Sequence, residues 1–184
     1  MERRFRAAFT ACHGDVLCFA RRRTDPERAE DIAAETFLVA WRRITDLPED
    51  PGDARAWLFG IARNCLLNDH RAQRRRDGLL VRLADPATAP LSPVLADTAD
   101  ATALRIDLAA AFSRLSATDQ EVLALVIFEQ LTTAQVGTVL DLTPGAVRVR
   151  LSRARAALRD QLADSTTTST PALCTSMTTE EVLP

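Results

Sequence analysis

The stretch LTPGAVRVRLSRARAALR, residues 142–159, contains five arginines and no acidic residue. Thr143 followed by Pro144 is a strong helix start, because the threonine hydroxyl can cap a free backbone N–H and proline has none to leave unpaired. The apolar residues after this start recur at helical spacing: Val147, Leu151, Ala154 and Leu158. The sequence therefore predicts a helix that packs by one face and leaves an arginine-rich face exposed.

A shorter helix is predicted just before this one. The segment TTAQVGTVL, residues 132–140, directs Val136 and Leu140 inward together with Leu131, and only the residues DLT separate it from Pro144. Two short helices joined by a tight turn, with basic residues near the start of the second, are typical of a helix-turn-helix, whose second helix enters the major groove of DNA. The cap, the turn and the preceding helix favour this interpretation over an amphipathic helix with a solvated arginine face.

The exposed positions of the second helix divide into two predicted roles. Arginine can bond two acceptors of a guanine, and each such pair is worth roughly 1–3 kcal/mol of discrimination between bases. We expect base contacts from the first exposed residues: Arg148, Val149, Ser152 and Arg153. Phosphate contacts, which set position rather than sequence, are expected from Arg150, Arg155 and Arg159.

The N-terminal part of the chain predicts a separate three-helix bundle. In the first helix, apolar residues recur at intervals of four and three, as on one helical face. A second helix is expected at 26–44 with Asp25 as its cap, and a loop rich in turn formers at 45–54. A third helix ends in the basic run RAQRRR at 71–76. The apolar faces are expected to form one core that includes Trp41.

The third helix carries aromatic, amide and basic residues together on its polar side. They are Phe59, Arg63, Asn64, Asn68, Arg71 and Arg74. Flat rings and amides beside arginines suit unpaired bases, which need a stacking partner and a hydrogen-bonding group. We therefore expect this helix to bind single-stranded nucleic acid.

Changes in composition divide the chain into four parts. Residues 77–103 contain the proline-rich DPATAPLSP, which is typical of a linker, and the Ser/Thr-rich tail at 164–184 is expected to be disordered. Helical domains are predicted at 1–76 and 104–163, and SATD at 116–119 resembles a capping box. The predicted fold class is all-α, with two small helical domains joined by a flexible linker and a helix-turn-helix in the second.

Charge and residue usage exclude several classes of function. The net charge of −2 and the pI near 5.7 give no overall nucleic-acid signature, so basic surfaces must be local. The cysteines form no CxxC pair, and the acidic cluster at 27–35 has no histidine beside it, so no metal or cofactor is expected. No glycine-rich phosphate loop or nucleophile with its base points to an enzyme. No segment suits a signal peptide or membrane insertion, so a cytoplasmic location is expected.

These motifs in combination resemble the sigma-70 family, specifically its extracytoplasmic-function type. AEDIAAETFLVAW at 29–41, followed by WLFGIARN at 57–64 and HRAQRRR at 70–76, is similar to the family's region 2. The segment from LSATDQ to RARAAL, residues 115–158, is similar to region 4. The resemblance implies an alternative sigma factor, not itself an enzyme, that binds core RNA polymerase and directs promoter recognition and melting.

The resemblance also implies roles for individual residues. The clamp of the largest polymerase subunit would bind the helix that holds Glu30, Asp31, Glu35, Thr36 and Phe37. The minus-ten element would be melted and captured by the loop at 45–54 with Arg63, Asn64, Asn68, Arg71 and Arg74. The minus-thirty-five element would be read as duplex by Arg148, Val149, Arg150, Ser152, Arg153 and Arg155. The implied partners are the clamp and flap regions of core polymerase, duplex promoter DNA, its melted non-template strand, and an anti-sigma protein.

Some positions depart from the family pattern. Gln135, Val136 and Gly137 stand where the family commonly has Glu-Ile-Ala, and Gly137 costs about 1 kcal/mol of helix propensity against alanine. Val149 stands where a small hydroxyl residue is common. The main alternative is a free-standing helix-turn-helix regulator, which would need a dimer interface to bind paired half-sites. A small helical enzyme is a third hypothesis. The sequence does not predict the relative orientation of the two domains.

Overall fold

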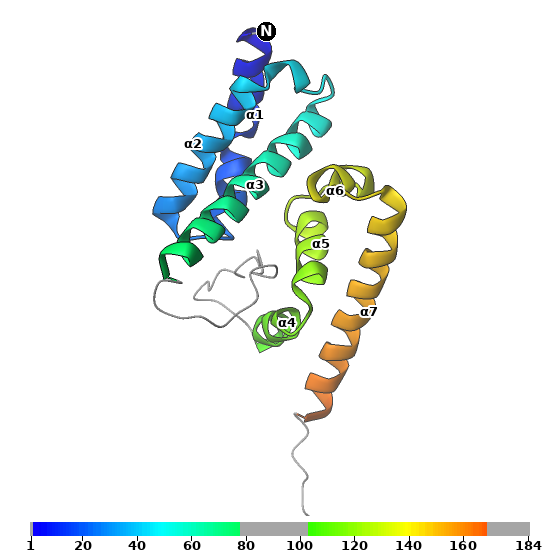
Figure 1. Ribbon diagram of the computed structural model, residues 1–184. Helices are drawn as coiled ribbons and strands as arrows, with labels where there is room; N and C mark the ends of the chain where they lie inside the picture. The colour runs from blue at the N-terminus through cyan, green and yellow to red at the C-terminus, as the bar shows by residue number, and fades with distance from the viewer. Residues whose placement is uncertain (1, 78–102, 169–184) are drawn as a thin grey trace, which may run out of the picture.

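The computed structural model describes residues 2–77 and 103–168, and regular structure within these ranges is entirely helical (Figure 1). The first range holds α1 (Glu2–Arg21), α2 (Pro26–Arg42), the 3-10 helix η1 (Ile44–Asp46) and α3 (Pro51–Asp77). The second range holds α4 (Ala103–Ser113), α5 (Ala117–Ile127), α6 (Thr133–Leu140) and α7 (Pro144–Thr168). The predicted all-α class with two helical regions is confirmed. The predicted linker and the tail after 168 lie outside the described residues.

Capping side chains begin the helices where the sequence predicted. The Asp25 carboxylate accepts a hydrogen bond from the backbone N–H of Arg28 at 3.0 Å, and Pro26 follows as the first helical residue. The Ser116 hydroxyl oxygen accepts from the backbone N–H of Asp119 at 3.2 Å. Both bonds satisfy a donor that the first turn of a helix leaves free.

Two predicted boundaries are wrong. The segment 45–54 was expected to be a loop, but α3 already begins at Pro51, where the Asp50 carboxylate caps the backbone N–H of Asp53 at 2.9 Å. This is a second Asp-Pro helix start, obscured by the surrounding turn-forming residues. At the other end of the chain, α7 continues to Thr168 and includes the first five residues of the predicted tail. A helix already formed extends readily, because each added residue gains a hydrogen bond without a new nucleation cost.

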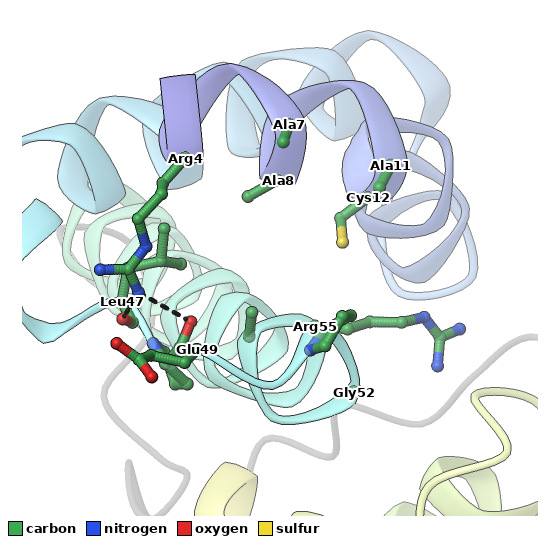
Figure 2. A pocket seen from close by; sticks show the side chains of 12 residues that line it. Arg4, Ala7, Ala8, Ala11, Cys12, Leu47, Glu49, Gly52 and Arg55 are labelled. Carbon is green, nitrogen blue, oxygen red and sulfur yellow. Dashed lines mark hydrogen bonds between the residues drawn. The ribbon is translucent and has the colours of Figure 1, made fainter. Parts of the chain in front are cut away.

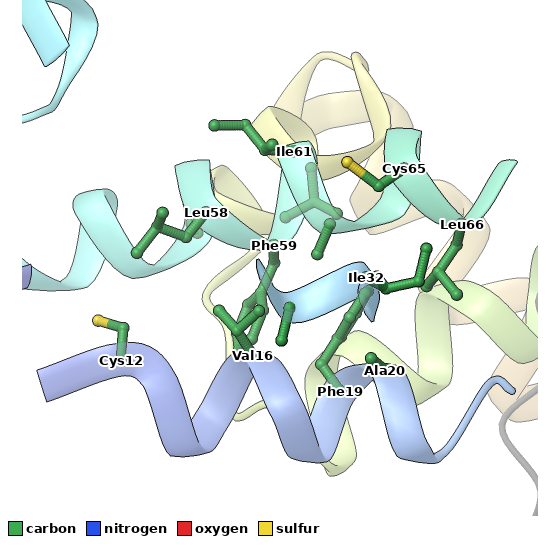
Figure 3. Close-up of a cluster of buried hydrophobic side chains, with 14 of the residues drawn as sticks. Cys12, Val16, Phe19, Ala20, Ile32, Leu58, Phe59, Ile61, Cys65 and Leu66 are labelled. Carbon is green, nitrogen blue, oxygen red and sulfur yellow. The ribbon is translucent and has the colours of Figure 1, made fainter. Parts of the chain in front are cut away.

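The core of the first region lies between α1, α2 and α3 (Figure 3). The Phe19 ring of α1 stacks on the Phe59 ring of α3 with centroids 4.9 Å apart. Phe59 is fully buried, so its predicted place on the polar side of α3 is wrong. Trp41, predicted to be in the core, is 46% exposed and meets the Phe5 ring edge-on at 5.0 Å. Periodicity located the apolar stripe of each helix but not how deeply each ring along it is covered.

The helix-turn-helix is closed by constraints at both ends of α6. Thr132 and Gln135 form a reciprocal capping box, with each side chain accepting from the other residue's backbone N–H at 3.3 and 3.0 Å. At the C-terminal end, Asp141 adopts a left-handed conformation with φ of 54°. The turn then folds back so closely that a Cβ on Gly137 would lie 2.5 Å from the carbonyl oxygen of Leu142. Gly137 is therefore required by the turn, whatever its cost in helix propensity.

The two regions also pack against each other. Helix α6 lies against α3 (Figure 1), and one hydrophobic cluster contains core residues of the first region together with Leu125, Leu131 and Val136 of the second. A second cluster, formed by α4, α5 and α7, belongs to the C-terminal region alone. The orientation that the sequence left open is thus a closed one, with a shared apolar interface.

We expect Gly137→Ala to lower the free energy of unfolding by about 2 kcal/mol, because the added methyl group collides with backbone that has little freedom to move. The matched control is Gly14→Ala in α1, where nothing lies within 4 Å of the new Cβ. That substitution should raise stability by about 0.5–1 kcal/mol through helix propensity. Urea unfolding followed by helical circular dichroism measures both, and equal effects of the two substitutions would contradict the steric explanation.

Candidate nucleic-acid interface

Helix α7 is oriented by its start and by its apolar face. The Thr143 hydroxyl oxygen accepts from the backbone N–H of Ala146 at 3.2 Å, as the sequence predicted, and Pro144 follows. Val147, Leu151 and Ala154 are buried against the rest of the domain. Because these three share one helical face, the residues between them are directed outward.

The outward face of α7 presents the predicted DNA-reading residues. Arg148, Val149, Ser152, Arg153 and Arg155 are exposed, Val149 to 52%, and Arg150 is half-buried. Within the described parts of the chain, none of these arginines takes part in an ion pair. Charged donors without a protein partner are available to phosphates and base edges.

The polar face of α3 is exposed along its C-terminal half. Asn64, Asn68, Arg71 and Arg74 are exposed, and Arg71 approaches the Asn68 side-chain oxygen at 3.4 Å. Arg63 differs from this group, because its guanidinium binds both carboxylate oxygens of Glu121 in α5, at 2.7 and 3.2 Å. Of the residues predicted to bind a single strand, Asn64, Asn68, Arg71 and Arg74 are therefore exposed, whereas Phe59 is buried and Arg63 is paired with the other region.

The acidic face of α2 is partly as predicted. Glu30, Asp31 and Glu35 are exposed, whereas Thr36 and Phe37 are buried in the core. The Thr36 hydroxyl donates to the backbone carbonyl of Ile32 at 2.6 Å, which satisfies it within the helix. Thr36 and Phe37, which the resemblance implied among the polymerase-binding residues, therefore both face the core.

The acidic face and the amide face meet at one hollow. A cavity of about 350 Å³ between α2 and α3 is lined by Asp31 and Glu35 from one helix and by Asn68 and Arg75 from the other. Residues far apart in sequence, predicted to bind different partners, are neighbours on one surface. No pattern in the sequence indicated this proximity.

A second cavity, of about 470 Å³, lies between α1 and the start of α3 (Figure 2). Alanines line its α1 side, and Arg4 spans its mouth to donate to the backbone carbonyl of Leu47 at 2.9 Å. Burial, reinforced by the charge of Asp15, raises the pKa of the Cys12 thiol in its wall. The cavity therefore offers no activated thiol nucleophile.

Sequence reasoning missed a buried acid. Glu129 lies in the turn between α5 and α6 and contacts Arg22 and Arg23, which directly follow α1. The available signal was a single carboxylate inside the apolar run VLALVIFEQL, because a charge among buried residues needs a partner from elsewhere. That signal indicates that a partner exists, but not which residue supplies it.

The fold and these surfaces define a helical nucleic-acid-binding protein with a helix-turn-helix. Family models described as sigma-70 region 2 and sigma-70 region 4 match residues 8–76 and 105–158. The chain belongs to the sigma-70 family of RNA polymerase sigma factors. It is of the extracytoplasmic-function type, and it acts as an alternative sigma factor in transcription initiation. None of the described helices is long and apolar enough to cross a bilayer.

Individual relatives agree with this assignment. SigL of Mycobacterium tuberculosis, an ECF RNA polymerase sigma factor, is 35% identical over 149 residues, which cover 80% of this chain and 82% of that protein. The probable sigma factor RfaY of Xanthomonas campestris is 36% identical over 161 residues, 83% of this chain, but the chain spans only 39% of that protein. The solved structure of sigma factor RpoE with the anti-sigma factor NepR, from Bartonella quintana, matches with a TM-score of 0.60 at 23% identity. It covers 86% of this chain and 96% of that one, and it shows the same fold.

We expect Thr143→Ala to destabilise the C-terminal region by about 1 kcal/mol, since the first turn of α7 then loses its side-chain acceptor. Thr143→Ser keeps the hydroxyl and should remain within a few tenths of a kcal/mol of the unmodified chain. Urea unfolding provides the measurement. Equal stability of the alanine and serine variants would show that the cap does not hold the start of α7.

Proposed function

We propose that the two regions divide promoter recognition between them, with α7 reading the minus-thirty-five element as duplex and α3 holding the melted minus-ten strand. The observation that carries the proposal is the outward arginine face of α7, on the second helix of a helix-turn-helix and without ion pairs among the described residues. Such a face matches the major groove in shape and charge.

On α7 the proposed roles follow from position along the helix. Residues in its first turns lie nearest the groove floor, so Arg148, Val149, Ser152 and Arg153 contact base edges. The exposed methyl groups of Val149 suit a thymine methyl rather than a hydrogen-bonding edge. Arg150 and Arg155 bind phosphates on either side and set the register.

On α3 the proposed roles require separated strands. Asn64 and Asn68 offer amides one turn apart that can bond unpaired base edges, while Arg71 and Arg74 follow the backbone. Arg63 joins this group only when it is released from Glu121. Because Phe59 is buried, base stacking has to come from another ring, and we propose the exposed Trp41 of α2 for this role.

The exposed acids of α2, Glu30, Asp31 and Glu35, are proposed to dock on the basic clamp of the polymerase's largest subunit, while the C-terminal region contacts the flap. Opposite charges favour such docking and speed association. Because the structurally similar RpoE was solved with an anti-sigma factor, we propose that an anti-sigma protein also binds this chain.

The chain is proposed to act in the cytoplasm without catalysing a reaction itself. The two buried cysteines support the absence of catalysis. Burial raises the pKa of Cys12 and raises that of Cys65 to about 11, so neither thiol is a nucleophile at neutral pH. A gel shift with promoter DNA separates the sigma role from that of a free-standing regulator. Tight, specific binding without core polymerase would favour the regulator.

We expect Arg153→Ala to weaken closed-complex formation by the holoenzyme about 5- to 150-fold, the equivalent of roughly 1–3 kcal/mol. Asn68→Ala should leave closed-complex binding mostly intact and reduce strand opening, because its partner base is exposed only after melting. Gel shifts at low temperature measure the first step, and permanganate reactivity of unpaired thymines measures the second.

The matched control is Arg114→Ala, which removes an exposed arginine from the same region that does not belong to α7. It should leave both steps within about twofold, as expected for a surface substitution without a specific partner. Equal loss of closed-complex binding in the Arg153 and Asn68 variants would refute the division of roles.

A further inference from the structure

Glu129 joins the two regions at a buried ionic contact. The residue is 1% exposed, and its carboxylate accepts from Nη2 of Arg22 at 2.6 Å and from Nη1 of Arg23 at 3.4 Å. Its backbone carbonyl accepts from Nη1 of Arg55 at 2.6 Å. All three arginines belong to region 2, and we call them the arginine cradle. Glu129 is the only acidic residue among the buried residues that the structure describes.

The cradle is held ready by region 2 itself. The Arg23 guanidinium lies over the Phe19 ring at 3.7 Å and donates to the Phe19 carbonyl at 2.9 Å, and Arg55 lies over the Phe59 ring at 4.7 Å. Burial lowers the pKa of Arg23 to about 10, so the group stays charged at neutral pH. A buried charge without a counter-ion is strongly unfavourable. The carboxylate of Glu129 therefore closes a site that region 2 leaves incomplete.

A second ionic contact involves a proposed DNA-binding residue. The two-point contact between Arg63 and Glu121 leaves their side chains only 24% and 13% exposed. Charge-assisted pairs of this geometry are among the stronger hydrogen bonds in proteins. While the pair persists, Arg63 cannot bind a phosphate or a base.

The apolar part of the interface needs a small residue at position 60. At Gly60, α3 approaches α6 so closely that a Cβ would lie 3.8 Å from both the carbonyl oxygen of Thr138 and the Cα of Val139. A methyl group fits at that distance, whereas a larger side chain would have to displace the α6 backbone. This contact is separate from both ionic contacts and contains no charge.

The closed arrangement is too short for a promoter. The minus-thirty-five and minus-ten elements, which α7 and α3 are proposed to bind, lie about 25 base pairs apart, or about 85 Å along duplex DNA. Helix α7 is about 37 Å long at 1.5 Å per residue, and α6, which precedes it, touches α3. A chain closed in this way cannot place α7 and α3 on both elements at once.

We propose that Glu129 is an internal latch, which holds regions 2 and 4 together by binding the arginine cradle. In this closed form Arg63 stays paired with Glu121, and the chain cannot span both promoter elements until region 4 moves away. The effect on DNA rests on the proposed function, but the latch itself does not. The latch is an intramolecular contact, so it needs no second protein to keep the free chain inactive.

Opening is tested first by small-angle X-ray scattering of the full chain without core polymerase. Glu129→Gln removes the charge at constant shape, and Gly60→Leu forces α6 away without touching a charge. Each should raise the radius of gyration by about a quarter, as expected when two compact regions separate. The matched controls are Glu2→Gln, which removes an exposed local ion pair, and Gly60→Ala, whose methyl group fits. Both controls should remain as compact as the unmodified chain.

Helical circular dichroism checks that each variant is folded. If Glu129→Gln does not fold, Gly60→Leu still tests the proposal, since both regions retain their own cores in that variant. Unchanged dimensions in every folded variant would overturn the latch. The latch would equally be overturned by an unmodified chain that is already as expanded as Gly60→Leu.

The second measurement is binding of a fluorescein-labelled single strand of mixed sequence, about 16 nucleotides long, again without core polymerase. If the open form is about a tenth of the unmodified population, the opened variants should bind about tenfold more tightly, and the controls should not. A larger radius of gyration without tighter binding of the single strand would overturn the proposal that the closed form inhibits DNA binding. Expansion and tighter binding together with a holoenzyme that starts no transcripts would support the latch and refute the proposed promoter roles.

Discussion

The close packing of α3 against α1 and α2 on one side and against α6 on the other is the contact on which the rest of the structure depends. Phe59 anchors the first side through its stack on Phe19, and the small size of Gly60 permits the second. Both contacts come from neighbouring residues of one helix. The position of the C-terminal region is therefore linked directly to the helix whose later turns carry Asn64, Asn68 and the exposed arginines.

This linkage gives charge two different uses in one molecule. On α7, arginines stand outward without ion pairs among the described residues, so they remain available to a polyanion. At the interface, Arg22 and Arg23 surround the buried Glu129, where a missing partner would cost far more than at the surface. A net charge near zero hides this arrangement completely. What matters for function is which arginines the fold leaves free and which it pairs.

The sequence predicted features that depend on neighbours along the chain. Asp25, Ser116 and Thr143 cap helices where expected, because a cap acts within three residues of its own position. Predictions failed where depth mattered: Phe59 was placed on a polar face and Trp41 in the core, and the structure reverses both. Helical periodicity gives the direction of a side chain, but the amount of cover over it depends on which other helix packs there.

By itself, the sequence determined the helices, the helix-turn-helix, the arginine face of α7 and the family, because each is encoded in local spacing and in short motifs. Only the tertiary structure decided that Gly137 is required by a turn and that Arg63 is paired with Glu121. The physical reason is the same in each case. Contact between residues far apart in the chain is set by how whole helices pack, and the local sequence of one helix contains no record of the surface it meets.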